Sequence, residues 1–214
     1  MSVQPAQPSD IVRAALDAYL DGWFPMHDAE AGITQWVQPE ARALIPLDDR
    51  FRVPRTTRQA IARSRFRITI DHAFPEVIRA CWKQERDGAW LHDNIVALFD
   101  HLHAAGFAHS VEAWIETENS RTLVGGLYGL ALGRVFAGES MFSRPDLGGT
   151  EASKVCLVAL VNELRSRQFI ALDSQLYNPH LEQFGLFEVA REDYLAMLAP
   201  QRELLAPGTW RTPG

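Results

Sequence analysis

The chain has 214 residues, of which 47% are hydrophobic and 22% charged, a composition that supports a packed core and argues against disorder. The formal net charge of −6 argues against non-specific nucleic-acid binding by the molecule as a whole. No apolar run approaches membrane-spanning length, and Cys81 and Cys156 lack metal-ligand spacing, so we expect a cytoplasmic protein with no metal, no cofactor and no membrane partner.

The first half of the chain predicts mostly helices. Ser9 or Asp10 can cap a helix whose apolar residues repeat on one face, and the Gly-Trp-Phe-Pro run at 22–25 ends it. Two prolines favour an irregular stretch after that. In chain order the expected elements are a helix over 10–21, an irregular stretch over 26–50, a short helix over 58–64, a strand over 66–70 and helices over 75–84 and 93–105.

Alternating apolar residues and a long amphipathic segment dominate the second half. Val111, Ala113 and Ile115 fall on one side of a predicted strand. The order of elements predicts an α+β or α/β domain built on a mixed sheet. The expected elements are a strand over 109–116, two strands within 121–142 that turn near Gly133, a helix over 151–167, an apolar strand over 169–177, and short helices from 179 and around 194–198.

Seven arginines and no acidic residue lie between Arg50 and Arg67. A solvated helix face is the ordinary explanation of a charge run, but such faces usually mix both signs. A phosphate-binding patch on an otherwise acidic protein is the alternative, and both interpretations stay open.

Three glycines, Gly125, Gly126 and Gly129, interrupt a predicted strand. Glycine weakens a sheet unless another group approaches the backbone closely. A bulge or a tight crossing is the ordinary explanation of the pattern, and exposed backbone that meets an acyl group or a peptide is the alternative. Neither a dinucleotide-binding nor a P-loop motif is present.

Two carboxylates lie in apolar surroundings. Glu139 lies in a run that contains Phe136, Met141 and Phe142. Asp173 interrupts an apolar strand in which alternation places Asp173 and Gln175 on one face. A buried carboxylate needs a hydrogen-bond partner or a wet cleft, and the sequence leaves both possibilities open for Asp173. If Glu139 and Asp173 share a cleft, they form an anionic well that attracts a cation or orients an amine.

Several motifs together resemble the leucyl/phenylalanyl-tRNA-protein transferase family, from about Tyr19 to Leu198. They are GWFP, RFRITIDHAFPEVIRAC, AHSVEAWIE, LVGGLYGLALGRVFAGESMFSR, ASK and LDSQLYN. The resemblance implies an α+β fold in which residues 65–214 form a domain like the GCN5-related acyltransferases and residues 1–64 a small, shortened N-terminal domain. It also implies transfer of Leu, Phe or Met from tRNA to the N-terminal amine of proteins that begin with Arg or Lys, which marks them for degradation.

The same resemblance implies roles for individual residues. Asp173 and Gln175 are the expected catalytic pair, and Glu139 and Ser140 are expected to bind the acceptor. The expected donor side-chain pocket consists of Leu127, Phe136, Leu157, Leu164 and Leu172. Tyr19, Met26 and Trp90 are expected around the terminal adenosine. The expected partners of the tRNA phosphates are Arg55, Arg58, Arg63 and Arg65.

The chain departs from the family pattern around the adenosine. Met26 stands where the family has a tryptophan after Phe-Pro, and Gln35 replaces the first of a Trp-Trp pair. An acyl-CoA-dependent N-acyltransferase is the alternative enzyme, because LGGTEASK before a long helix faintly resembles a pyrophosphate-binding turn. A non-catalytic module that binds tRNA ends or N-terminal degrons is the third possibility.

Overall fold

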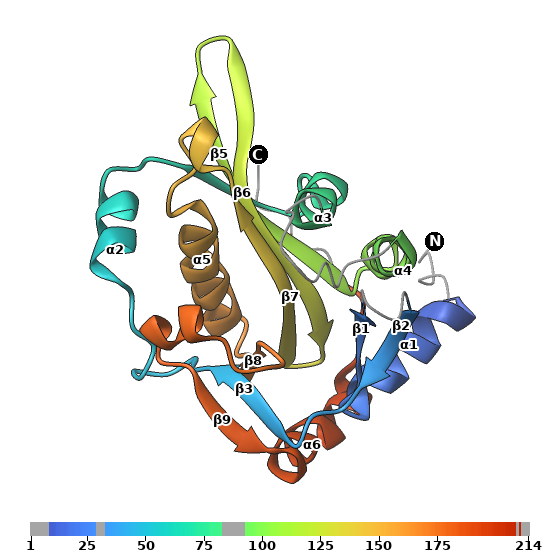
Figure 1. Cartoon of the computed structure of the whole chain (residues 1–214). Coiled ribbons are helices and arrows are strands. Elements are labelled where there is room, and N and C mark those ends of the chain that lie inside the picture. The colour runs from blue at the N-terminus through green and yellow to red at the C-terminus, as the bar shows by residue number, and fades with distance from the viewer. Residues whose placement is uncertain (1–8, 29–32, 83–92, 209, 211–214) are drawn as a thin grey trace, which may run out of the picture.

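A seven-stranded mixed sheet organises the fold (Figure 1). The computed structural model describes residues 9–28, 33–82, 93–208 and 210. The strand order is β4-β5-β6-β7-β8-β3-β9, and only the β7–β8 pair is parallel. The strands of this sheet are β3 (Ala41–Ile45), β4 (Arg67–Ile70), β5 (Ala108–Thr117), β6 (Ser120–Leu132), β7 (Val135–Ser143), β8 (Ala171–Asp173) and β9 (Phe187–Ala190).

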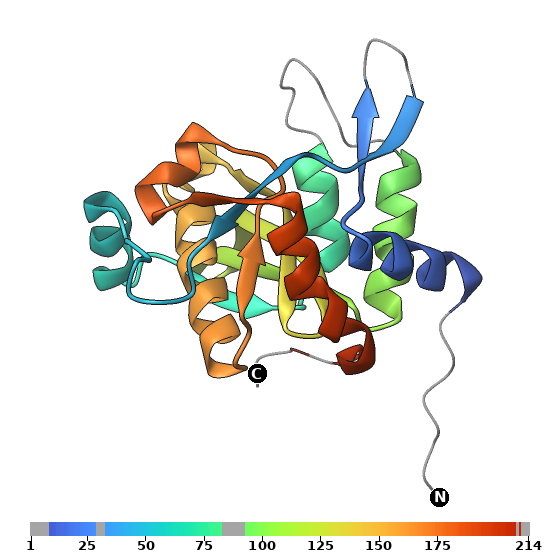
Figure 2. The same ribbon diagram turned by 90° about the horizontal axis from the view of Figure 1, so that it is seen from below.

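Helices cover both faces of the sheet (Figure 2). The adjacent glycines of β6 show the two layers, because Gly125 faces Ala152 on one side and Gly126 faces Val77 on the other. A separate hairpin is formed by β1 (Phe24–Asp28) and β2 (Ile33–Val37). The helices are α1 (Asp10–Leu20), α2 (Arg55–Ala62), α3 (Phe74–Trp82), α4 (Asp93–Ala104), α5 (Ala152–Ser166) and α6 (Arg191–Leu198), with short 3-10 turns at Pro145–Leu147, Pro179–Phe184 and Ala199–Leu204.

The expected mixed sheet flanked by helices is confirmed, and the helices and central strands lie close to their predicted positions. The prediction of an irregular stretch over 26–50 is wrong, because β1, β2 and β3 occupy it. These strands are short and do not alternate, and β3 pairs with β8 and β9, which come from the other end of the chain. The division at residue 64 stays a prediction, although β3 lies on its N-terminal side and inside the sheet.

The predicted strand over 169–177 is much shorter than expected. β8 ends at Asp173, and Gln175 has a left-handed backbone with φ +60°, which no strand accommodates. Asp173 and Gln175 therefore do not share a strand face as predicted. The following strand, β9, was missed, because its four residues follow a turn and carry no strong pattern.

A buried polar cluster surrounds Glu112 in the motif at 109–116. Glu112 is fully buried and accepts hydrogen bonds from Thr69 Oγ1 and Ser110 Oγ, each at 2.5 Å, and from the backbone N–H of Ala73. Burial raises the pKa of this carboxyl above its ordinary value. The cluster ties β4 and β5 to the start of α3.

No helix in the described ranges is both long enough and apolar enough to span a membrane.

The three strand glycines are packing positions. A Cβ on Gly129 would lie 2.3 Å from the Ala137 carbonyl oxygen and 2.3 Å from the Phe136 ring, and a Cβ on Gly125 would lie 2.4 Å from Ala152 Cβ. Such contacts are shorter than van der Waals distances, so these glycines allow tight layer packing. The first interpretation, a close crossing, is confirmed.

Gly129→Ala is expected to destabilise the fold, because its Cβ meets backbone that cannot move aside. Overpacking of this kind costs about 1–3 kcal/mol. Gly138→Ala on β7 is the matched control, because its Cβ has 3.5 Å to its nearest neighbours. Denaturant unfolding measures both variants, and equal free energies of unfolding would contradict the packing explanation.

Candidate active site

A cavity of about 610 Å³ opens where β7 and β8 separate. The two strands pair only from Val135 to Ala137 and from Ala171 to Asp173. Beyond these residues, 138–143 of β7 form one wall and 173–178 form the other. The predicted carboxylates, Glu139 and Asp173, therefore share one cavity, as the anionic-well hypothesis requires.

A β-bulge directs Glu139 into this cavity. Tyr128 of β6 pairs with Ser140, and Gly129 pairs with Gly138, so Glu139 is the extra residue of β7. Bulges re-aim side chains next to many binding sites. Tyr19 Oη donates a hydrogen bond to Glu139 Oε1 over 2.9 Å, and Gln175 Nε2 donates to the same oxygen over 3.3 Å.

The environment of Glu139 favours its protonated form when the cavity is empty. Burial among apolar walls raises its pKa to about 8, the Tyr19 hydrogen bond opposes that rise, and the nearby Asp173 charge adds to it. Glu139 is still partly exposed to the cavity. A cation that enters the cavity and pairs with Glu139 would favour the ionised form.

Asp173 is fully buried and fully hydrogen-bonded. Its Oδ1 accepts from Arg42 Nε at 3.0 Å and from the backbone N–H of Gln175 at 2.9 Å. Its Oδ2 accepts from Arg42 Nη2 at 2.6 Å and from Tyr194 Oη at 2.9 Å. An ionised carboxylate offers about four lone-pair positions, and these four bonds occupy them.

Arg42 of β3 is the functional candidate that the sequence prediction missed. Its side chain is 2% exposed, and its third polar contact is Nη1 to the Gly22 carbonyl at 2.8 Å. The guanidinium lies between two rings, with Cζ 4.8 Å from the Phe24 centroid and 4.5 Å from the Tyr194 centroid. The available signal was a single arginine in the apolar run Ala41–Ile45, the counterpart of the single acid at Asp173.

Gln175 is held in its left-handed conformation by β3 and by Asp173. Its carbonyl accepts from the Ala43 N–H, the Ser174 N–H donates to the Ala43 carbonyl, and its own N–H is bonded to Asp173. The amide Nε2 points to Glu139, and within the described ranges no residue donates a hydrogen bond to Gln175 Oε1. This oxygen can accept a hydrogen bond from a ligand.

The apolar wall includes part of the predicted donor pocket. Leu127, Leu157 and Leu172 line the cavity, together with Ile45, Leu160 and Phe184. Phe136 and Leu164 are fully buried behind that wall, in the same apolar cluster. They support the wall and do not line it.

The residues predicted around the adenosine lie in different surroundings. Met26 lines the cavity, as does Ser140, which is predicted at the acceptor site instead. Tyr19 is fully buried, with Trp36 and Phe99 packed edge-on against its ring, so it presents no free face and instead holds Glu139. Trp90 lies outside the described residues.

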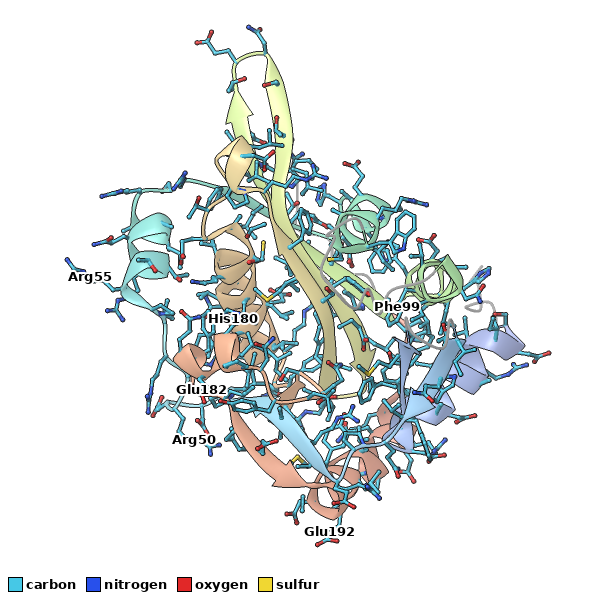
Figure 3. The ribbon with its side chains drawn as sticks, in the orientation of Figure 1. Arg50, Arg55, Phe99, His180, Glu182 and Glu192 are labelled. Carbon is cyan, nitrogen blue, oxygen red and sulfur yellow. The ribbon has the colours of Figure 1, made fainter. Side chains whose placement is uncertain are left out.

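The predicted phosphate-binding arginines are exposed on and after α2, which packs beside α5. Figure 3 shows Arg55 pointing away from the body of the protein. Two of these side chains donate hydrogen bonds to backbone carbonyls, Arg58 to that of Val53 and Arg65 to that of Gly148. The structure describes no ion pair of Arg55, Arg58, Arg63 or Arg65 with an acidic residue in its ranges.

The N-terminus of α5 is unfavourable for a pyrophosphate. Ser143 Oγ already accepts the Ser153 N–H. The Glu151 carboxylate stands beside it and is bonded to Thr57 Oγ1 at 2.7 Å and Lys154 Nζ at 3.0 Å. The Glu151 carboxylate already occupies the Lys154 cation and the Thr57 hydroxyl that a phosphate could use, which argues against the acyl-CoA alternative. No cluster of metal-binding side chains occurs among the described residues.

Comparison with known proteins finds relatives over most of the chain. A family model described as leucyl/phenylalanyl-tRNA protein transferase matches residues 44–199. This chain belongs to that family. Its leucyl/phenylalanyl-tRNA–protein transferase relatives include one from Akkermansia muciniphila, 46% identical over 86% of this chain and 91% of the relative. A second, from Herpetosiphon aurantiacus, is 46% identical over 84% and 88%.

The resemblance noted in the sequence is thereby confirmed, and the chain is an aminoacyltransferase of the leucyl/phenylalanyl-tRNA–protein transferase type. A relative from Chlorobaculum tepidum is 43% identical over 87% of this chain and 93% of its own length. Among solved structures, FemX is similar with a TM-score of 0.53 and 12% identity, over 72% of this chain and 60% of FemX. That likeness shows the fold alone.

The raised pKa of Glu139 predicts a pH-dependent stability for this transferase. Between the ordinary value of 4.5 and about 8, the folded protein keeps a proton that the unfolded chain releases. Stability therefore falls as pH rises through this window, and Glu139→Gln removes that loss. We expect the variant to exceed the wild type by about 1 kcal/mol or more near pH 8 and by little near pH 4.

Denaturant unfolding at several pH values measures this difference. Glu188→Gln, which changes an exposed carboxylate on β9, is the control and should show no such trend. A gain from Glu139→Gln that is independent of pH would contradict the assigned protonation.

Proposed function

We propose that this protein transfers Leu, Phe or Met from aminoacyl-tRNA to the N-terminal amine of proteins that begin with Arg or Lys. The carrying observation is the cavity between β7 and β8, which has Glu139 on one wall and apolar residues on another. One wall suits a cationic residue and the other an apolar side chain. Membership of the leucyl/phenylalanyl-tRNA–protein transferase family supports the same reaction.

The reaction needs positioning more than an activated nucleophile. The aminoacyl ester is already activated, so the neutral amine nitrogen of the acceptor attacks its carbonyl carbon. A C–N bond forms, the ester C–O bond breaks, and the terminal ribose hydroxyl leaves with a proton while the amine loses one. Holding both substrates in reactive geometry supplies several kcal/mol toward such a step. The amide oxygen of Gln175 is placed to accept the hydrogen bond of the amine.

The acceptor side chain is expected beside Glu139. The Arg or Lys cation replaces the proton of this carboxyl, and the apolar surroundings strengthen the attraction by lowering the local dielectric. Tyr19 and Gln175 fix the carboxyl in position. Ser140, the next residue on β7, also lines the cavity and can contact the acceptor backbone.

The donor side chain is expected against Leu127, Leu157 and Leu172. Apolar contact discriminates weakly, about 1–3 kcal/mol per methylene, so Leu, Phe and Met should all be accepted. The exposed arginines at and after α2 would bind acceptor-stem phosphates, which positions a tRNA and does not read its sequence. Such substrates imply a cytoplasmic location and a role in N-terminal-degron proteolysis. The mixed sheet flanked by helices is compatible with kinship to GCN5-related acyltransferases.

Glu139→Gln is expected to raise the KM for a peptide beginning with Arg by at least tenfold while kcat changes little. The neutral amide keeps the shape and the Tyr19 contact but loses the counter-charge, which is worth about 1–3 kcal/mol as a charged hydrogen bond. Transfer of labelled Leu, Phe and Met from tRNA to Arg- and Gly-starting peptides measures the effect. An unchanged preference for Arg over Gly would remove Glu139 from the acceptor site, and no transfer by the wild type would favour a non-catalytic module.

Met26→Trp is expected to tighten binding of an aminoacyl-adenosine analogue by about tenfold. Met26 lines the cavity where the family has a tryptophan, and base–aromatic stacking contributes about 1–3 kcal/mol per base. Trp90→Ala should weaken binding of the same analogue. Equilibrium binding measures both, and no gain from the first with no loss from the second would contradict the adenosine assignment.

A further inference from the structure

We propose that Arg42 is a positioning residue that cancels the charge of Asp173, so that the cavity can balance only one cation and the attacking α-amine is held neutral. This inference rests on the proposed function. It starts from the buried pair of Arg42 and Asp173, whose side chains are 2% and 0% exposed. The pair is bidentate, and together with the bonds from Tyr194 Oη and the Gln175 N–H it leaves Asp173 no lone pair for a substrate.

The charge count of the cavity follows from this pair. The guanidinium and the Asp173 carboxylate sum to zero, and Tyr194 and the Gln175 N–H complete the shell of the carboxylate. The titratable groups that face Arg42 and Asp173 are Glu139 of β7, Tyr19 of α1 and Tyr194 of α6. Both tyrosines remain neutral at physiological pH, because burial raises their pKa values well above the ordinary range. Lys154 and His180 also line the cavity, and Lys154 is paired with Glu151 at 3.0 Å. Among the described residues that line the cavity, Glu139 is then the single carboxyl that can serve as a counter-ion.

An acceptor that begins with Arg or Lys carries two positive charges, one on the side chain and one on the α-ammonium. Glu139 can balance the side chain. The second cation would face the neutral pair of Arg42 and Asp173 and find no remaining counter-charge, so the α-amine binds in its neutral form. Only a neutral amine has the lone pair that attacks the ester, so the charge balance of the cavity also selects the reactive species.

Strand β3 controls both the charge of Asp173 and the position of Gln175. Arg42 of β3 pairs with Asp173 of the neighbouring strand β8, while Ala43 of β3 fixes the backbone of Ser174 and Gln175. The guanidinium also bonds the Gly22 carbonyl at the end of α1. One strand thus sets the charge of Asp173 and the position of the Gln175 amide together.

The test is the pH dependence of kcat and KM for transfer to an Arg-starting peptide in three variants. Arg42→Gln leaves Asp173 uncompensated and stabilises the α-ammonium. The apparent pKa on the acid side of the kcat profile should rise by about one pH unit. kcat should therefore be roughly tenfold lower than that of the wild type near pH 7 and equal to it at high pH. Asp173→Asn leaves Arg42 uncompensated, which destabilises the α-ammonium. KM should be about tenfold higher, and the apparent pKa on the acid side of the kcat profile should fall.

The double variant Arg42→Gln with Asp173→Asn is the decisive member. Because its Gln and Asn side chains are both neutral, the apparent pKa of the kcat profile should return to the wild-type value. Its kcat should lie within about threefold of the wild type. If the double variant is as impaired as Asp173→Asn alone, Asp173 acts directly on the amine and the proposal is overturned. If Arg42→Gln does not fold, the other two variants still decide between these results.

Two controls separate a structural effect from the proposed one. Arg191→Gln breaks an arginine–carbonyl contact between α6 and Pro39 near β3, and it should leave the pH profile unmoved. NMR titration of the Glu139 carboxyl gives a readout that does not depend on catalysis. The pKa of Glu139 should rise in Arg42→Gln, fall in Asp173→Asn and return to the wild-type value in the double variant. An unmoved Glu139 titration overturns the charge account, whereas absent transfer by the wild type counts against the proposed function alone.

Discussion

The buried ion pair between Arg42 and Asp173 is the interaction on which the site depends. It joins β3 to β8 within the sheet and connects the end of α1 to the cavity through the Gly22 carbonyl. Removing one partner of such a pair leaves an uncompensated buried charge, which is far more costly than replacing both partners. The pair therefore ties the integrity of the fold to the charge of the cavity.

Around this pair, the two walls of the cavity have different tasks. β7 supplies Glu139 through a bulge, which leaves one titratable carboxyl facing the ligand. The turn after β8 supplies Gln175, whose left-handed backbone is stabilised by Asp173 and by β3. Strain of this kind persists where surrounding contacts determine it, and it commonly accompanies a binding site. The cavity thus combines a fixed neutral pair with one adjustable charge.

The sequence predicted much of this architecture and part of the site. Helical and strand periodicity located α5 and the β6–β7 hairpin, and the motifs led to the family. Periodicity could not place β3, because its partners lie more than a hundred residues later and its strand character comes from pairing. It could not show the bulge at Glu139 either, since register between strands decides which residue is extra. A lone arginine and a lone acid in two apolar runs were a usable signal for the pair, and it was missed.

The most direct test of the account is a crystal structure with a non-hydrolysable aminoacyl-adenosine analogue and a peptide beginning with Arg. The account predicts that the peptide guanidinium contacts Glu139 and that its α-amine lies within hydrogen-bond reach of Gln175 Oε1. Arg42 and Asp173 should remain paired. An α-amine or guanidinium bonded to Asp173, with Arg42 displaced, would contradict the account.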